Sequence, residues 1–284
     1  MENKDLLITT NSSMDVVARN KNGLLFEVDN HIKYNKDHIN VIYINGSQLA
    51  HYDAQGRSIF SPVSNNVNYG HVGDFYNEDI KPYVFKYIVD KDSDGVEEFS
   101  KSLIEILKGL DTNQNIVIGK SYGGTIGSFS AHSDLIKEVL AINPSICGSP
   151  LADLDLIMRT RKNISDYITY IGCKRVLEPG RRFTLENTNG VDIDYSDKIH
   201  IYGGTIEGLR PHTIMEIIHT IGYDKIMRLT GQKSDGIAVW DQEYYDSKGF
   251  DTIIMDRPYH SHSELSSYMK VPFQRVKQYV KEKK

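Results

Sequence analysis

The stretch that decides the fold is Asn115–Ser128, which reads N-I-V-I-G-K-S-Y-G-G-T-I-G-S. Ile116, Val117 and Ile118 form an apolar, β-branched run that is too short for a helix. Such a run is typical of a strand that is buried on both faces of a parallel sheet. The small residues that follow Gly123 suit a helix packed close to that sheet. The stretch therefore predicts a strand, a tight turn and a helix in succession.

The predicted turn, Gly119-Lys120-Ser121-Tyr122-Gly123, has the pattern G-x-S-x-G. Glycines at its two ends leave room for the neighbouring strand and helix, while the serine between them is held in a strained conformation that projects its hydroxyl beyond the sheet. Ser121 is therefore a candidate nucleophile. The alternative is an unreactive serine in a glycine-rich turn, and the motif alone does not separate the two.

The composition is that of an ordinary globular protein, with 284 residues of which 39% are hydrophobic and 25% are charged. An α/β alternation runs through the whole chain, which favours a single domain, residues 1–284. A formal net charge of -5 provides no general attraction to nucleic acid or to anionic membranes. No apolar run has the length of a signal sequence or a membrane span, so we expect a soluble cytoplasmic protein without an integral membrane segment.

Other apolar runs predict the remaining elements of the sheet. We expect an antiparallel edge within residues 6–29, strands at 39–44, 83–89, 139–143, 198–202 and 250–255, and helices at 96–110, 214–221 and 271–280. The polar stretch that follows Ser47 and runs to about residue 79 is expected to be a long loop, and a loop of that length is usually functional or mobile. Residues 151–195 break the α/β rhythm and are expected to form an insertion above the sheet.

Reactive side chains follow several of the predicted strands. Ser47 comes shortly after the strand at 39–44, Asp235 follows the strand at 198–202 and a helical excursion, and His262 follows the last strand. Ligands of an open parallel sheet bind beyond the carboxyl ends of its strands, so we expect these residues at one rim together with Ser121. A serine needs a base, and the base needs a third group that fixes its tautomer.

On these residues the chain resembles an α/β-hydrolase, in which a serine elbow, an acid and a histidine follow one another in that order. It looks most similar to the bacterial lipases and esterases. Ser234-Asp235-Gly236-Ile237 resembles their acid turn, and residues 143–153 resemble their run T-P-x-x-G-S-x-x-A-D. The resemblance implies a mostly parallel central sheet with helices on both faces and a lid-like insertion at about 151–195.

The resemblance also implies a chemical role for each residue. Ser121 would attack a carboxylic ester, His262 would remove the serine proton, and Asp235 would orient the imidazole. The backbone N–H groups of Ser47 and Tyr122 would stabilise the oxyanion. Water would then release the acyl group, so the expected partner is a small-molecule acyl ester, and neither a cofactor, a metal nor a nucleic acid is expected.

The sequence departs from the family pattern at the start of the predicted oxyanion loop. Lipases of this group usually begin that loop with His-Gly, whereas Asn45-Gly46 stands here. The donor is the backbone N–H of the following residue, so Ser47 can still fill this role. How the loop is braced is left open.

Alternatives remain for the residues and for the reaction. His260 is the rival base, although His262-Ser263-Glu264-Leu265 resembles the His-x-x-Leu run of the family. Asp241 is the rival acid, although Asp235 lies in the turn that the fold predicts. The same fold serves thioesterases and acyltransferases, and it can be kept as a non-catalytic binding module, which we would expect to have a broken triad.

Overall fold

The computed structural model describes residues 7–8, 14–28, 32–44, 46, 51–52, 58–60, 77–88, 95–112, 114–152, 189–212, 214–255 and 265–283. The predicted site residues Ser47, His260 and His262 lie outside these ranges. So does most of the predicted insertion at 151–195.

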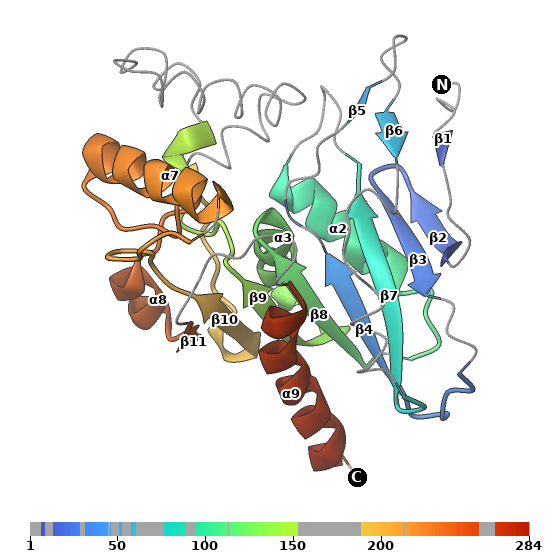
Figure 1. Cartoon of the computed structure of the whole chain (residues 1–284). Coiled ribbons are helices and arrows are strands. Elements are labelled where there is room, and N and C mark those ends of the chain that lie inside the picture. Colours follow the sequence, from blue (N-terminus) through green and yellow to red (C-terminus); the bar gives the residue numbers. More distant parts are fainter. Residues whose placement is uncertain are drawn as a thin grey trace.

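The molecule is built around an eight-stranded sheet with the order β11-β10-β9-β8-β4-β7-β3-β2 (Figure 1). The strands are β2 Met14–Asn20, β3 Gly23–Val28, β4 Ile39–Ile44, β7 Ile80–Tyr87, β8 Asn115–Lys120, β9 Ile136–Ile142, β10 Ile199–Gly203 and β11 Asp251–Ile254. Every pairing from β11 to β7 is parallel, whereas β3 pairs antiparallel with both β7 and β2. The mostly parallel sheet and its antiparallel edge confirm the sequence prediction.

A second, small sheet was not predicted. It has the order β1-β6-β5 and consists of β1 Leu7–Ile8, β5 His51–Tyr52 and β6 Ser58–Phe60. The assignment of residues 6–9 to the edge of the main sheet was therefore wrong, as was the expectation of a loop throughout residues 48–79. Strands of two or three residues are too short to show an alternating pattern in the sequence.

Helices lie on both sides of the large sheet. They are α2 Val96–Leu107, α3 Tyr122–Phe129, α7 Ile214–Thr230, α8 Gln242–Lys248 and α9 Leu265–Lys283. Short 3-10 turns occupy Ser130–His132, Pro150–Ala152 and Ser196–Lys198. Helices α7 and α9 extend beyond the predicted ranges, and α8 was missed because seven mostly polar residues show little helical periodicity.

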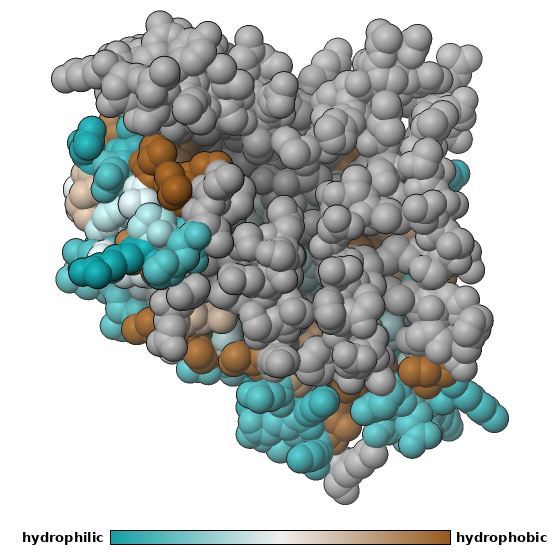
Figure 2. Space-filling view, in the orientation of Figure 1, coloured by the Kyte–Doolittle hydropathy of each residue, from teal (hydrophilic) through white to brown (hydrophobic). Residues whose placement is uncertain are grey.

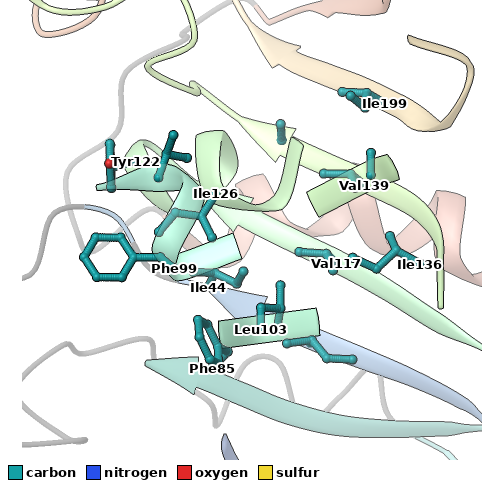
Figure 3. Packing of buried hydrophobic residues seen from close by; sticks show 14 of the residues in the cluster. Ile44, Phe85, Phe99, Leu103, Val117, Tyr122, Ile126, Ile136, Val139 and Ile199 are labelled. Carbon is teal, nitrogen blue, oxygen red and sulfur yellow. The ribbon is translucent and has the colours of Figure 1, made fainter. Parts of the chain in front are cut away.

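Among the described residues, the two larger apolar clusters lie one on each face of the sheet, and a third, small cluster joins Leu151, Ile226 and Val239. In β4, Ile42 and Ile44 belong to the layer that contains α2 and α3, whereas Val41 and Tyr43 belong to the layer under α9. This alternation follows from the two-residue period of a strand. Figure 3 shows the first layer, in which side chains of α2 and α3 meet those of the central strands. The sheet is therefore covered on both faces, and ligands are expected at its carboxyl edge.

The docking of α9 can be tested at Phe273, which is fully buried against the sheet. Phe273→Ala is expected to lower the free energy of unfolding by about 3–5 kcal/mol, the usual cost of deleting a buried phenylalanine side chain. Urea denaturation followed by circular dichroism measures this change. The neighbouring Gln274 is exposed, so Gln274→Ala is a matched control that should cost less than about 0.5 kcal/mol. Similar losses in both variants would contradict this packing.

Candidate active site

Ser121 occupies the sharp turn that connects β8 to α3. Its backbone has φ 52° and ψ -127°, a region in which a residue with a side chain is strained. Hydrogen bonds hold this conformation: the Ser121 N–H donates to the Ile142 carbonyl at 2.8 Å, and the Ser121 carbonyl accepts from the Gly124 N–H at 2.8 Å. The predicted strand, turn and helix are thus present, with a strained, partly exposed serine between them.

The glycines around Ser121 are required because α3 approaches β8 closely. A Cβ on Gly119 would lie 2.3 Å from the carbonyl oxygen of Gly123. One helical turn later, a Cβ on Gly127 would lie 2.9 Å from Cγ1 of Val117. A contact under 3.0 Å forces one of the two atoms to move, so a residue with a side chain is disfavoured at both positions.

The chain beyond β4 lies directly against the serine. A Cβ on Gly46 would be 2.9 Å from the Cβ and 3.4 Å from the Oγ of Ser121. The predicted donor Ser47 is the next residue in the chain and lies outside the described ranges. The other predicted donor, Tyr122, is the first residue of α3 and is buried. The first N–H groups of a helix are not used by its own hydrogen-bond ladder, which suits this residue to an anionic ligand atom.

Asp235 lies in the turn between α7 and α8, and its side chain is buried. Its Oδ1 accepts hydrogen bonds from the N–H groups of Ile237 at 2.9 Å and Ala238 at 2.8 Å. Burial raises the pKa of Asp235 to about 6, because it outweighs these hydrogen bonds and the charge of Lys120, which lower it. The carboxyl group is thus ionised at neutral pH and held in one orientation.

The acid turn is wedged between two parts of the fold. On one side it meets α7, where a Cβ on Gly222 would lie 2.0 Å from the carbonyl oxygen of Gly236. On the other side, the Ser149 hydroxyl donates to the Ile237 carbonyl. Ser149 belongs to the run at 143–153 that was likened to the lipases, so this run supports the acid turn.

Two titratable side chains that the sequence analysis gave no role lie in the same region. The charge of Lys120, the residue before Ser121, interacts with both Asp235 and His219. Burial lowers the pKa of Lys120, and Asp235 raises it in part. Burial and then Lys120 lower the pKa of His219 to about 3, so this imidazole stays neutral. The second position of G-x-S-x-G is variable, so the sequence contained no signal for Lys120.

The rival acid, Asp241, has a structural role. It is the N-cap of α8, and its Oδ1 accepts a hydrogen bond from the Tyr244 N–H at 2.9 Å, which is the usual function of an aspartate at this position. The two candidate bases, His260 and His262, lie in the segment between β11 and α9, outside the described residues. The base therefore stays a prediction, as do the catalytic roles of Ser121 and Asp235.

Other kinds of site find little support in the part of the chain that the structure describes. There, no group of three or more His, Cys, Asp or Glu residues is arranged to hold a metal ion. Burial raises the pKa of the Cys147 thiol to about 11, so this cysteine is not a thiolate nucleophile at neutral pH. None of the described helices combines the length and the apolar character needed to cross a bilayer.

No protein-family model and no curated protein sequence matches this chain, but solved structures do. An α/β-hydrolase fold protein from Chitinophaga pinensis has a TM-score of 0.52 at 11% identity, over 94% of this chain and 97% of its own. Naproxen esterase from Bacillus subtilis has a TM-score of 0.50 at 11% identity, over 94% and 90%. The bottromycin epimerase BotH has a TM-score of 0.50 at 10% identity, over 95% and 100%.

These similarities confirm the predicted α/β-hydrolase fold. The similar structures include both an esterase and an epimerase. A shared fold therefore does not determine the reaction, which has to be argued from the residues of the site.

The tight elbow can be tested with Gly119→Ala. The added Cβ would collide with the backbone of Gly123, so the turn must shift, and we expect a loss of stability of about 1–3 kcal/mol. Gly109→Ala is the matched control, because a Cβ there meets only the Ile106 carbonyl oxygen at an ordinary 3.5 Å. Thermal denaturation of both variants measures the difference. An equal Tm for the two variants would show that the turn accommodates a Cβ at residue 119 without strain.

The buried carboxyl group predicts that Asp235→Asn stabilises the protein above pH 6. The pKa of Asp235 is about 6 in the folded protein, compared with 3.8 for an unperturbed aspartate, which represents the unfolded chain. The folded state therefore binds more protons between these values, so stability falls as the pH rises from about 4 to about 6 and stays reduced above. A shift of about two units corresponds to about 3 kcal/mol, which is the upper limit for the gain at pH 8.

Thermal denaturation at pH 4 and pH 8 tests this prediction. Asp235→Asn should have a higher Tm than the wild type at pH 8 and a similar Tm at pH 4, because the carboxyl group is protonated there. Asp241→Asn is the control, since asparagine is an equally good N-cap. A lower Tm of Asp235→Asn at pH 8 would mean that the carboxylate is stabilised by its surroundings.

Proposed function

We propose that this chain, which has the α/β-hydrolase fold, is a serine hydrolase that cleaves a carboxylic ester through an acyl-enzyme intermediate. The observation that supports this most is the geometry at Ser121. A strained serine at the start of α3 has the backbone of Gly46 against its hydroxyl. A carbonyl carbon attacked by Ser121 would place its oxygen between the N-terminus of α3 and the loop after β4, which is where an oxyanion hole is needed.

In the proposed reaction, His262 removes the proton of Ser121 as the serine oxygen attacks the ester carbonyl. The N–H groups of Ser47 and Tyr122 bind the negative oxygen of the tetrahedral intermediate. The intermediate collapses when the imidazolium donates its proton to the leaving alcohol, and the acyl group stays on Ser121. A water molecule, deprotonated by the imidazole, then releases the carboxylic acid and restores the serine.

The environment of Asp235 supports its role as the acid of the triad. Its Oδ1 already accepts two backbone N–H groups, so Oδ2 is the oxygen suited to accept from an imidazole. A pKa of about 6 keeps the carboxyl group ionised at neutral pH, and a negative charge beside the imidazole stabilises its protonated form during the reaction.

The surface beside the acid turn supports a substrate with an apolar acyl chain. Ile217 and Ile218 of α7 are 47% and 44% exposed, and Ile237, two residues after Asp235, is 41% exposed. Figure 2 shows apolar residues gathered over α7. A thioester substrate or an acceptor alcohol would use the same groups, so thioesterase and acyltransferase activities are the alternatives within this chemistry. A non-catalytic binding module would need none of them.

A fluorophosphonate probe tests the nucleophile. The wild type should become labelled on Ser121 and should hydrolyse p-nitrophenyl esters, whereas Ser121→Ala should show neither property. Peptide mass mapping identifies the labelled residue. An unlabelled wild type without turnover above buffer would overturn the proposed function and favour a binding module.

A pair of histidine variants identifies the base. His262→Ala should lower kcat by roughly 10⁴-fold or more, as removal of a triad member does, while His260→Ala should stay within roughly tenfold of the wild type. Steady-state kinetics on a p-nitrophenyl ester measure both. The reverse pattern would assign the base to His260 and leave the reaction class unchanged.

A further inference from the structure

A buried tyrosine binds the chain at the start of the predicted oxyanion loop. Tyr87, the last residue of β7, is 1% exposed, and its hydroxyl donates a hydrogen bond to the carbonyl oxygen of Gly46 at 2.7 Å. Strands β4 and β7 are parallel neighbours whose last pair is Ile44 and Phe85. Gly46 lies two residues after Ile44, and Tyr87 lies two residues after Phe85, so the two are beside each other at the carboxyl edge of the sheet.

The covalent geometry of the peptide bond gives this hydrogen bond a consequence for the next residue. The carbonyl of Gly46 and the N–H of Ser47 belong to one planar, trans peptide unit and point in opposite directions. A hydrogen bond that fixes the carbonyl therefore also fixes the direction of the N–H. The backbone of Gly46 lies close to the Ser121 side chain. In the proposed mechanism the N–H of Ser47 binds the oxyanion, so rotation of this peptide unit would turn that N–H away from its acceptor.

The ring of Tyr87 also contacts the residue that provides the other predicted donor. The centroids of the Tyr87 and Tyr122 rings are 5.9 Å apart. Phe99 of α2 contacts both, with centroids 4.9 Å from Tyr87 and 6.5 Å from Tyr122. All three side chains are buried, and Figure 3 shows Phe99 and Tyr122 in the cluster that also contains Ile44. Tyr87 thus contacts both segments that are predicted to bind the oxyanion.

We propose that Tyr87 is a positioning residue of the active site. Its hydroxyl braces the oxyanion loop through the Gly46 carbonyl and so keeps the N–H of Ser47 aligned with the N-terminus of α3. This inference rests on the proposed function, and it addresses the bracing that the sequence Asn45-Gly46 left open. Tyr87 acts through Gly46 and does not touch the substrate. Its hydroxyl favours the transition state because an oxyanion donor contributes most when it is already in place.

The chain provides a matched control for the deletion of this hydroxyl. Tyr83 lies on the same strand and points to the same face, and it is buried to a similar extent. Its hydroxyl interacts with Lys81, whereas the hydroxyl that binds the Gly46 carbonyl is that of Tyr87. Tyr83→Phe and Tyr87→Phe therefore remove the same group from the same strand, and only the second removes the bond to Gly46.

The test compares both variants with the wild type by kinetics per active site. Fluorophosphonate titration counts the protein molecules whose Ser121 reacts with the probe. The value of kcat is then calculated per reactive molecule, so misfolded protein does not lower it. Assays with a p-nitrophenyl ester are made well below the Tm of each variant. The Ki of a trifluoromethyl ketone, which binds as a tetrahedral adduct, reports on oxyanion binding directly.

Tyr87→Phe is expected to lower kcat per titrated site by roughly 10- to 100-fold, less than the roughly 10²- to 10³-fold lost when an oxyanion donor is deleted. KM should change by less than about threefold, since the ground-state carbonyl depends little on the donor. The Ki of the ketone should rise by about the same factor as kcat falls. Tyr83→Phe should stay within about twofold of the wild type in all three values.

The possible failures are distinguishable. A Tyr87→Phe variant with a lower Tm but an unchanged kcat per site would show that the hydroxyl only stabilises the fold, which overturns the inference and leaves the proposed function intact. A wild type and a Tyr83→Phe variant that both fail to react with the probe would overturn the proposed function, and the role of Tyr87 with it.

Discussion

The close approach of α3 to β8 is the constraint on which the rest of the site depends. A helix that begins immediately after a parallel strand and packs back on it leaves little space for side chains where the two meet, and Gly119 in the strand and Gly127 in the helix meet this requirement. Ser121 then adopts a strained backbone conformation with a positive φ and is held there by hydrogen bonds to the neighbouring strand and helix. The strain is confined to the Ser121 backbone, but the residues that hydrogen-bond to it belong to β9 and α3. The elbow therefore exists only because the core is assembled around it.

Two further segments lie near the elbow, one beside Ser121 and the other near Lys120. From the β4 side, Gly46 fits against Ser121, and the hydroxyl of Tyr87 holds its carbonyl. From the α7 side, the turn with Asp235 is fixed by backbone hydrogen bonds and by the contact of Gly236 with α7. In each case a glycine permits a close backbone contact and a hydrogen bond then sets the direction of a polar group. Such preorganisation is what a site needs if it is to stabilise charge that develops during a reaction.

The charges near the elbow are costly to the fold. Burial raises the pKa of Asp235 and lowers the pKa values of Lys120 and His219. The ionised forms of Asp235 and Lys120 are therefore less stable here than in water. Lys120 and Asp235 offset part of this cost for each other. Because burial raises the pKa of Asp235, we expect its carboxylate to lower the stability at neutral pH. Stability alone would favour a neutral residue there, so the buried carboxylate points to a function.

The sequence by itself determined the parts of the protein that depend on neighbours in the chain. Strand, turn and helix around Ser121 are consecutive, so their glycines and apolar runs were sufficient to predict them. The antiparallel edge followed from short β-like runs, whereas the mostly parallel sheet and the role of the Asp235 turn were implied by the resemblance to α/β-hydrolases. The short strands of the second sheet and helix α8 did not, because such short elements show no clear period.

The tertiary structure alone decided which distant side chains meet. Tyr87 and Gly46 are 41 positions apart, and neither lies in a motif that would link them. Lys120 stands at a variable position of the elbow, and only the packing of α7 against the acid turn brings it near Asp235 and His219. Such contacts follow from strand order and helix packing, which are global properties of the fold, and no local pattern of residues encodes them.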